Sequence, residues 1–254
     1  MKPVVNHSFT KIYWRRILMI MIVFGSLAIM FSLPRFGQDP SYHSFADQRE
    51  FFGIPNFFDV ISNFAFLFVG IAGLRICFKK HLGRMRHCWL ILFSGVSLVS
   101  IGSAYYHSNP IDHTLVWDRL PMTIGFTGLF VALLGEYISE KFRLLIIPAL
   151  LLGLSSVVYW QWSDDLRFYI WVQTISLLII PLVMILYRSH YSHQWMLLVA
   201  LLFYALAKIA ELNDKKIFEL SSALVSGHTI KHLLAALGCL VIALMLQKRK
   251  LLER

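Results

Sequence analysis

Five polar residues have the types and the spacing of a catalytic metal site. His228 and His232 lie one helical turn apart where an apolar stretch begins, so both imidazoles share one helix face, and His107 offers a third nitrogen. Ser103 precedes His107 by one turn, and Asp118 follows the short loop after it. Three protein ligands with one open position are typical of a catalytic zinc site.

These residue types suit hydrolysis of an amide or an ester. Zinc lowers the pKa of a bound water to about 7, which makes a hydroxide nucleophile available at neutral pH. Asp118 could accept a proton from that water and return it to a leaving amine. Ser103 could donate a hydrogen bond to the developing oxyanion.

Each of these residues also has an ordinary structural interpretation. A single histidine at a membrane interface is more often a packing residue than a ligand, and His113 remains a weak substitute ligand. Asp118 could pair with Arg119 or cap its helix, where a carboxylate is favourable. Ser103 could bond to its own helix.

The composition predicts an all-α integral membrane protein. The chain is 57% hydrophobic and 15% charged, with a mean hydropathy of +0.64, whereas soluble domains are about half apolar and about a quarter charged. A helix needs about 20 apolar residues to cross a membrane. The chain offers eight such stretches, at roughly 15–33, 57–77, 88–106, 117–136, 143–160, 168–187, 194–212 and 226–247.

The net charge of +10 is distributed as a topology signal. Every second loop is basic, as in the loop with Lys79, Lys80, Arg84 and Arg86, and the intervening loops carry most of the acidic residues. This positive-inside pattern places both termini in the cytoplasm after eight spans. No nucleic-acid motif is present, so the partner that we expect is the bilayer.

The topology tests the proposed site. If the N-terminus is cytoplasmic, the third span ends, and the fourth and eighth spans begin, at the non-cytoplasmic face. All five polar residues then share one depth, where buried polar groups are expensive and indicate function. The outside loop at 35–56 is rich in turn residues and could fold over the mouth of the bundle.

The cysteines and the first span are not expected to take part in the proposed site. Cys77 and Cys88 border a predicted cytoplasmic loop and Cys239 lies in the last span, so we expect no disulfide. The first span lacks an obvious cleavage site and is predicted to be an uncleaved anchor. Lys208 and Glu211 are predicted to pair as structural support, with headgroup contact as the alternative.

Four motifs carry a family resemblance. Residues 102–107 and 117–122 resemble the Ser-x3-His and Asp-x-Leu-Pro-Met signatures of the alkaline ceramidases, and 226–232 resembles their closing His-x3-His motif. Residues 57–63 are similar to the Ser-Asn start of their first core helix. Over roughly residues 45–245 the chain therefore resembles this family, which belongs to a superfamily with the adiponectin-receptor-like proteins.

The resemblance implies a seven-helix core that binds zinc and cleaves an N-acyl sphingoid amide to a fatty acid and an amine. It assigns His107, His228 and His232 to zinc, and Ser103 and Asp118 to catalysis. The implied organisation is a cytoplasmic segment and an additional helix at 1–34, an outside loop at 35–56, a hydrolase core at 57–247 and a basic tail at 248–254.

The chain departs from the family at its calcium site. Asn56 stands where the family has a first-helix glutamate that binds calcium. Asp47, Glu50 and Asn56 could supply only part of an oxygen ligand set, so zinc is the expected cofactor and calcium is doubtful.

The leading hypothesis is a zinc-dependent hydrolase of ceramide-like N-acyl lipids, embedded in a bacterial inner membrane. One alternative is a receptor-like or structural member of the superfamily, with zinc and little turnover. Another is a small transporter with a proton-relaying His/Asp chain, although no repeat of Gly/Pro-broken helices is evident. The sequence does not determine which acyl chain or headgroup the substrate has, or whether the cleaved bond is an amide or an ester. It does not determine the oligomeric state either.

Overall fold

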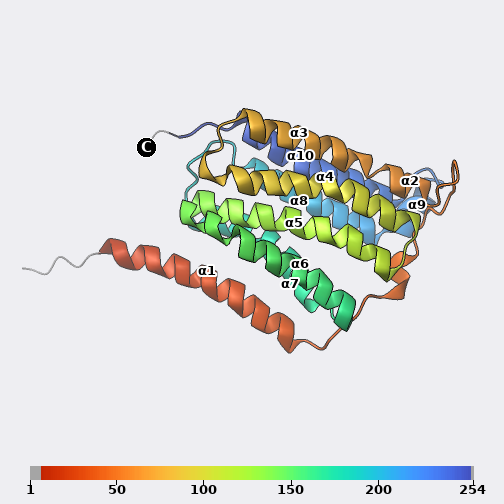
Figure 1. Cartoon of the computed structure of the whole chain (residues 1–254), viewed down its shortest axis with the longest axis horizontal. Coiled ribbons are helices and arrows are strands. Elements are labelled where there is room, and N and C mark those ends of the chain that lie inside the picture. The colour runs from red at the N-terminus through yellow and green to blue at the C-terminus, as the bar shows by residue number, and fades with distance from the viewer. Residues whose placement is uncertain (1–6, 253–254) are drawn as a thin grey trace, which may run out of the picture.

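Long helices lie side by side in the computed structural model, which describes residues 7–252 (Figure 1). Seven helical segments of this part are long and apolar enough to cross a membrane, and α8 with α9 forms an eighth, broken one. The prediction of an all-α membrane protein is confirmed. The long helices are α1 (His7–Ser32), α3 (Phe64–Lys79), α4 (Arg86–Ser108), α5 (Asp112–Tyr137), α6 (Ile146–Ser163), α7 (Arg167–Leu186), α8 (Met196–Leu212) and α10 (Gly227–Lys248). The short ones are α2 (Phe57–Ile61), α9 (Asp214–Leu220) and the 3-10 helices η1 (Pro40–His43), η2 (Gly83–Met85) and η3 (Glu140–Leu145).

One span that the sequence predicts as continuous, 57–77, is interrupted at Asn63, whereas the predicted span 194–212 coincides with α8 and the chain breaks just after it, at Asn213. Between α2 and α3, the Asn63 amide donates to the carbonyl oxygens of Asp59 and Val60, at 2.8 and 3.3 Å. After α8, the Asn213 amide donates to Ile209 O at 2.8 Å, and α9 turns away by 80°. In both places a side chain occupies a backbone acceptor of the preceding helix, which favours an interruption there.

Helix α5 is the most enclosed of the spans. It packs closely against α4 because glycines face each other at the crossing. A methyl group on Gly102 would clash with the carbonyl oxygen of Trp117, and one on Gly95 would clash with the backbone of Gly125. Small residues let helix backbones approach inside a membrane, where packing drives helix association. This crossing places the end of α4 beside the start of α5.

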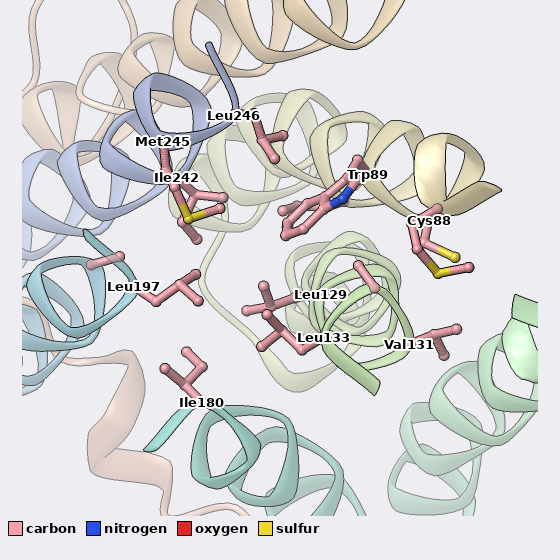
Figure 2. Close-up of a cluster of buried hydrophobic side chains, with 14 of the residues drawn as sticks. Cys88, Trp89, Leu129, Val131, Leu133, Ile180, Leu197, Ile242, Met245 and Leu246 are labelled. Carbon is pink, nitrogen blue, oxygen red and sulfur yellow. The ribbon is translucent and has the colours of Figure 1, made fainter. Parts of the chain in front are cut away.

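The packed core lies at the end of the bundle where α4 begins and α10 ends. Figure 2 shows Trp89, Leu133 and Met245 converging there from α4, α5 and α10. The Trp89 indole donates to Glu136 Oε1 at 2.7 Å, and Arg249 donates to Glu136 Oε2 at 2.7 Å. This ion pair satisfies a carboxylate that would otherwise be buried without a partner.

Helix α1 lies on the outside of the bundle against α7 (Figure 1). Between Trp14 and Ser32, most of its side chains are not buried by the protein, as expected for a helix that faces lipid. Arg167 on α7 holds its end by donating to the carbonyl oxygens of Phe31 and Leu33, at 3.0 and 2.6 Å. Asp165 in turn holds Arg167, with an ion pair of 2.7 Å.

The start of α1 and the end of α10 lie at the same end of the bundle (Figure 1). The loop 33–56 and α9 lie at the other end, where α4 ends and α10 begins. The structure therefore separates a packed end near the termini from an end that holds the polar residues. That the termini face the cytoplasm stays a prediction.

Candidate active site

Three buried histidines meet where α4 ends and α10 begins. His107 comes from α4, and His228 and His232 come from the first turns of α10. One ligand atom from each lies within 4.8 Å of the others, and the ring centroids are 4.7 to 4.9 Å apart. Among the described residues, this three-histidine group is the one cluster of His, Cys, Asp and Glu side chains that could hold a metal ion.

The free nitrogens of this group suit a metal. Both ring nitrogens of His107 and Nε2 of His232 are buried without a hydrogen-bond partner. Buried polar atoms are almost always paired, so the one lone pair that each neutral imidazole offers here could be satisfied by an ion. Three imidazoles match the ligand preference of zinc, and their number leaves a coordination position open.

Ser62 selects the nitrogen that His232 presents. The Ser62 hydroxyl donates to the Asp59 carbonyl at 3.0 Å and lies 2.7 Å from His232 Nδ1. Since its hydrogen is used, it accepts from Nδ1–H, and the lone pair of His232 then resides on Nε2. Such a second partner fixes the tautomer and the orientation of a metal-binding imidazole.

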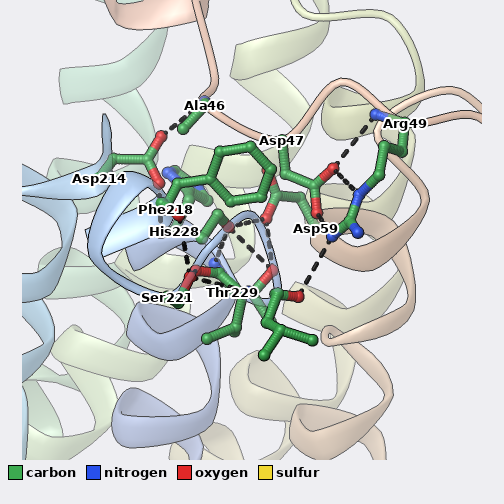
Figure 3. Close-up of polar contacts among 12 residues, drawn as sticks. Ala46, Asp47, Arg49, Asp59, Asp214, Phe218, Ser221, His228 and Thr229 are labelled. Atoms are coloured by element: carbon green, nitrogen blue, oxygen red, sulfur yellow. Dashed lines mark hydrogen bonds and ion pairs between the residues drawn. The ribbon is translucent and has the colours of Figure 1, made fainter. Parts of the chain in front are cut away.

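Two carboxylates fix the start of α10 (Figure 3). Asp59 Oδ1 accepts from the hydroxyls of Ser226 and Thr229, at 2.9 and 2.7 Å. Asp214 accepts from the backbone N–H of His228 and of Ala46, each at 2.8 Å. Carboxylates are favourable at a helix N-terminus because they accept from its free N–H groups. They hold α10 against both α2 and the loop 33–56.

Ser103 and Asp118 lie in the same cavity wall as His232. Both are buried, and the Ser103 hydroxyl interacts with the Asp118 carboxylate across the α4–α5 crossing. Asp118 forms no ion pair with Arg119 among the described residues. The guanidinium of Arg119 instead donates to Gln38 and stacks on Trp160 and Tyr169.

The cavity has a volume of about 370 Å³ and lies between α4, α5, α7, α8 and α10. Its polar end holds Ser103, Asp118 and His232. Away from this end the walls are mainly apolar and reach the packed core at Leu129 and Ile242. A lipid chain would therefore meet apolar walls when its polar group reaches the histidines.

The loop 33–56 covers the histidines, as the sequence suggested. Phe45 is buried, and its ring lies 4.6 Å from the rings of both His107 and His228. Tyr42 donates to Glu211 Oε1 at 3.2 Å. Burial raises the pKa of Tyr42, and the negative charge of Glu211 raises it further, so Tyr42 stays a neutral donor.

The residues considered as calcium ligands do not share one partner in the structure. Asp47 forms an ion pair of 2.6 Å with Arg49, and Asn56 donates to His107 O at 2.8 Å. Glu50 is exposed, as is His113. The structure brings none of these side chains into the three-histidine group.

A cluster of charged side chains borders the histidines. Lys208 and Glu211 form the predicted ion pair. Lys231, which the sequence reasoning missed, lies 2.8 Å from Glu211 Oε1 and 3.2 Å from His228 Nε2. A lysine inside an apolar span was itself a signal of function. The sequence places Asp59 at the depth of the histidines without indicating its partners, and Tyr42 was missed, because only the tertiary contacts show which residues each side chain contacts.

The fold and the site define a multi-pass membrane protein with a buried histidine cluster beside a serine and an aspartate. The ceramidase family profile matches residues 53–254, and the chain belongs to this family. The match supports a hydrolase with a lipid substrate and leaves α1 outside the matched residues. A comparison with curated proteins gave no match.

Proposed function

We propose that the protein is a zinc-dependent hydrolase that cleaves the amide bond of ceramide-like N-acyl lipids to a fatty acid and an amine. One observation carries the proposal: a histidine cluster with free nitrogens adjoins Ser103 and Asp118 at the polar end of an apolar cavity. Membership of the ceramidase family supports it.

His107, His228 and His232 would hold the zinc ion. When bound, zinc supplies Lewis acidity that activates water and polarises a carbonyl group. Asp118 accepts a proton from the attacking water and delivers it to the amide nitrogen as the C–N bond breaks. Ser103 donates a hydrogen bond to the carbonyl oxygen as negative charge develops there.

The remaining residues position the substrate. The apolar walls receive the acyl chain and direct its carbonyl carbon toward Asp118 and the histidines. Phe45 shields the histidines from the aqueous side. Limiting bulk water strengthens the electrostatic contacts that stabilise the transition state.

The proposal is tested by measuring zinc and fatty acid release together. The purified wild type should contain zinc and release fatty acid from ceramide. His228→Ala should lose both, because one of three ligands is removed. His113→Ala is the matched control, since His113 is exposed and lies outside the histidine group. A wild type without zinc, or a His228→Ala variant with full zinc content and activity, contradicts the proposal.

A second candidate is a receptor-like or structural protein with negligible turnover. It is favoured by one feature, because the histidines join α4 to α10 and an ion between them would cross-link the two helices. This candidate predicts bound zinc that raises the melting temperature, without fatty acid release from any N-acyl lipid. The two proposals thus differ in turnover and agree in metal content.

The setting of the enzyme is proposed with its function. We infer a bacterial inner membrane, cytoplasmic termini and an active site near the non-cytoplasmic face, from the basic loops at the end of the bundle that holds the termini. Residues 57–247 form the hydrolase core, and α1 is an addition beside α7.

A further inference from the structure

The polar end of the cavity carries more cationic than anionic side chains. Lys208, Lys231 and Arg119 line it together with only two carboxylates, Glu211 and Asp118. A zinc ion on neutral histidines would add further positive charge. Unbalanced charge at a buried site favours a ligand of the opposite sign.

Arg119 is a buried cation whose guanidinium makes no direct ion pair with a carboxylate in the described part of the chain. Its guanidinium lies 3.9 Å from the Trp160 ring and 4.7 Å from the Tyr169 ring, and Nη1 has no hydrogen-bond partner. Buried arginine side chains are normally paired, and the planar guanidinium suits carboxylate and phosphate groups.

Lys231 supplies a second donor. Glu211 is shared between Lys231 and Lys208, so these three side chains keep a net charge of +1. The Lys231 ammonium has three hydrogens and contacts two acceptors, Glu211 and His228. One hydrogen therefore remains for a ligand in the cavity that Lys231 lines.

Both cations lie at the reacting end of the cavity. Lys231 and Arg119 are each close enough to Asp118 to interact with its carboxylate. The excess positive charge thus adjoins the group that would protonate the leaving amine, whereas the acyl chain would occupy the apolar end.

We propose that the amine half of the substrate carries an anionic group, a carboxylate or a phosphate, which Arg119 and Lys231 bind. This inference rests on the proposed hydrolase function and narrows its substrates to anionic N-acyl lipids. The two side chains then act as specificity determinants, since they bind the headgroup and transfer no proton.

A matched substrate pair tests the charge directly. N-octanoylserine carries a carboxylate where N-octanoylserinol carries a hydroxymethyl group, and the two amides are otherwise identical. With the zinc-loaded wild type, kcat/KM should be about tenfold or more higher for the serine amide, as expected for a buried charge-assisted contact. N-octanoylethanolamine and its phosphate ester, compared in the same way, distinguish a phosphate from a carboxylate preference.

Variants then assign the preference to residues. Arg119→Gln and Lys231→Gln should each reduce the serine-to-serinol ratio of kcat/KM toward one. Lys216→Gln is the matched control, because Lys216 is an exposed lysine of α9 outside the cavity, and it should keep the wild-type ratio. Zinc content and melting temperature establish whether each variant is folded. If a variant is not folded, the serine-to-serinol ratio of kcat/KM of the wild type still tests the preference for an anionic headgroup.

The outcomes separate this inference from the proposed function. Fatty acid release from both amides at equal rates, or faster release from serinol, overturns the anionic headgroup and leaves the hydrolase standing. No release from any amide, ceramide included, overturns the hydrolase. In that case, calorimetric titration with the same two amides tests the anion site, and equal affinities overturn it as well.

Discussion

At the scale of single residues, hydrogen-bond direction decides how the histidines can act. The Ser62 hydroxyl donates its one hydrogen to the Asp59 carbonyl oxygen, so its oxygen can only accept a hydrogen bond from His232. This leaves the lone pair of His232 on Nε2, which has no hydrogen-bond partner and is available to a metal ion. A hydroxyl with no direct contact to the metal would thus control the metal affinity.

Replacing Ser62 with alanine should weaken zinc binding by about 10- to 100-fold, the range found for partners of metal-binding histidines. Competition with a chelator measures this affinity. Ser176→Ala is the control, because Ser176 is a buried serine that donates only to its own helix, at Val172 O. Equal zinc affinities in both variants would show that Ser62 does not orient His232.

Replacing Asp118 with asparagine should lower kcat by about 10²- to 10⁴-fold, because the amide cannot accept the proton of water. Zinc content should not change, since Asp118 is not part of the histidine group. Metal analysis and fatty acid release check the two expectations on one sample. Loss of zinc would make Asp118 a ligand in place of a proton acceptor.

The sequence predicted those residues whose spacing along one helix carries the information. His228 and His232 share a helix face by their separation alone, and charge-based topology predicted a common depth with His107. The spacing of Lys231 and Arg119 did not reveal their contacts, because their partners Glu211 and Trp160 come from other helices. Pairings of this kind depend on how the spans pack.

At the scale of the elements, the α4–α5 crossing positions Ser103 and Asp118, the proposed catalytic pair. Gly102 adjoins Ser103 and faces the carbonyl oxygen of Trp117, which adjoins Asp118. Backbone approach at this point therefore sets the separation between the two functional side chains. The sequence predicted both spans, but it could not predict which glycines meet.

Replacing Gly102 with alanine should lower the melting temperature and reduce activity, because its methyl group forces α4 from α5. Gly25→Ala is the control on α1, where nothing lies within 4 Å of the added methyl group, and it should be neutral or slightly stabilising. Thermal unfolding in detergent measures both. A Gly102→Ala variant as stable and active as wild type would refute the close crossing.

The link between α1 and α7 should depend on pH. Hydrogen bonds from Arg167, above all, lower the pKa of Asp165 from 3.8 to about 2. Its contribution to stability is therefore present above about pH 4 and is lost as the pH falls through about 2. Asp165→Asn should lower the melting temperature at pH 7, and its difference from wild type should shrink toward pH 2.

Arg35→Ala is the control for this experiment. Arg35 is mostly exposed and lies 3.9 Å from Asp165, so its loss should change the melting temperature little. A difference between wild type and Asp165→Asn that stays constant from pH 7 to pH 2 would contradict the role of this carboxylate.

At the scale of the whole molecule, the two ends of the bundle differ in composition and packing. The end that holds the termini is basic and tightly packed around Trp89, whereas the other holds the polar site under the loop 33–56. Hydropathy and charge predicted the eight segments, because length and loop charge are local properties. The cavity was not predictable, since side chains from several helices and from the loop 33–56 form it.

Cysteine labelling tests the orientation of the bundle. In spheroplasts, a membrane-impermeant maleimide should label Ala223→Cys without permeabilisation and Lys80→Cys only after it, because these exposed residues lie in loops at opposite ends. The native Cys77 and Cys88 are buried and should give a low background. The reverse pattern would place the active site at the cytoplasmic face.

If the cavity holds the acyl chain as proposed, its depth would select for chain length. Its lining runs along α10 from His232 to Ile242, which is about 15 Å at the helical rise of 1.5 Å per residue. Beyond Ile242, the packed side chains around Trp89 and Met245 form a floor. A chain that reached this floor would stop there, so on the proposed function the distance from floor to histidines would determine which acyl lengths place a carbonyl group at the histidines.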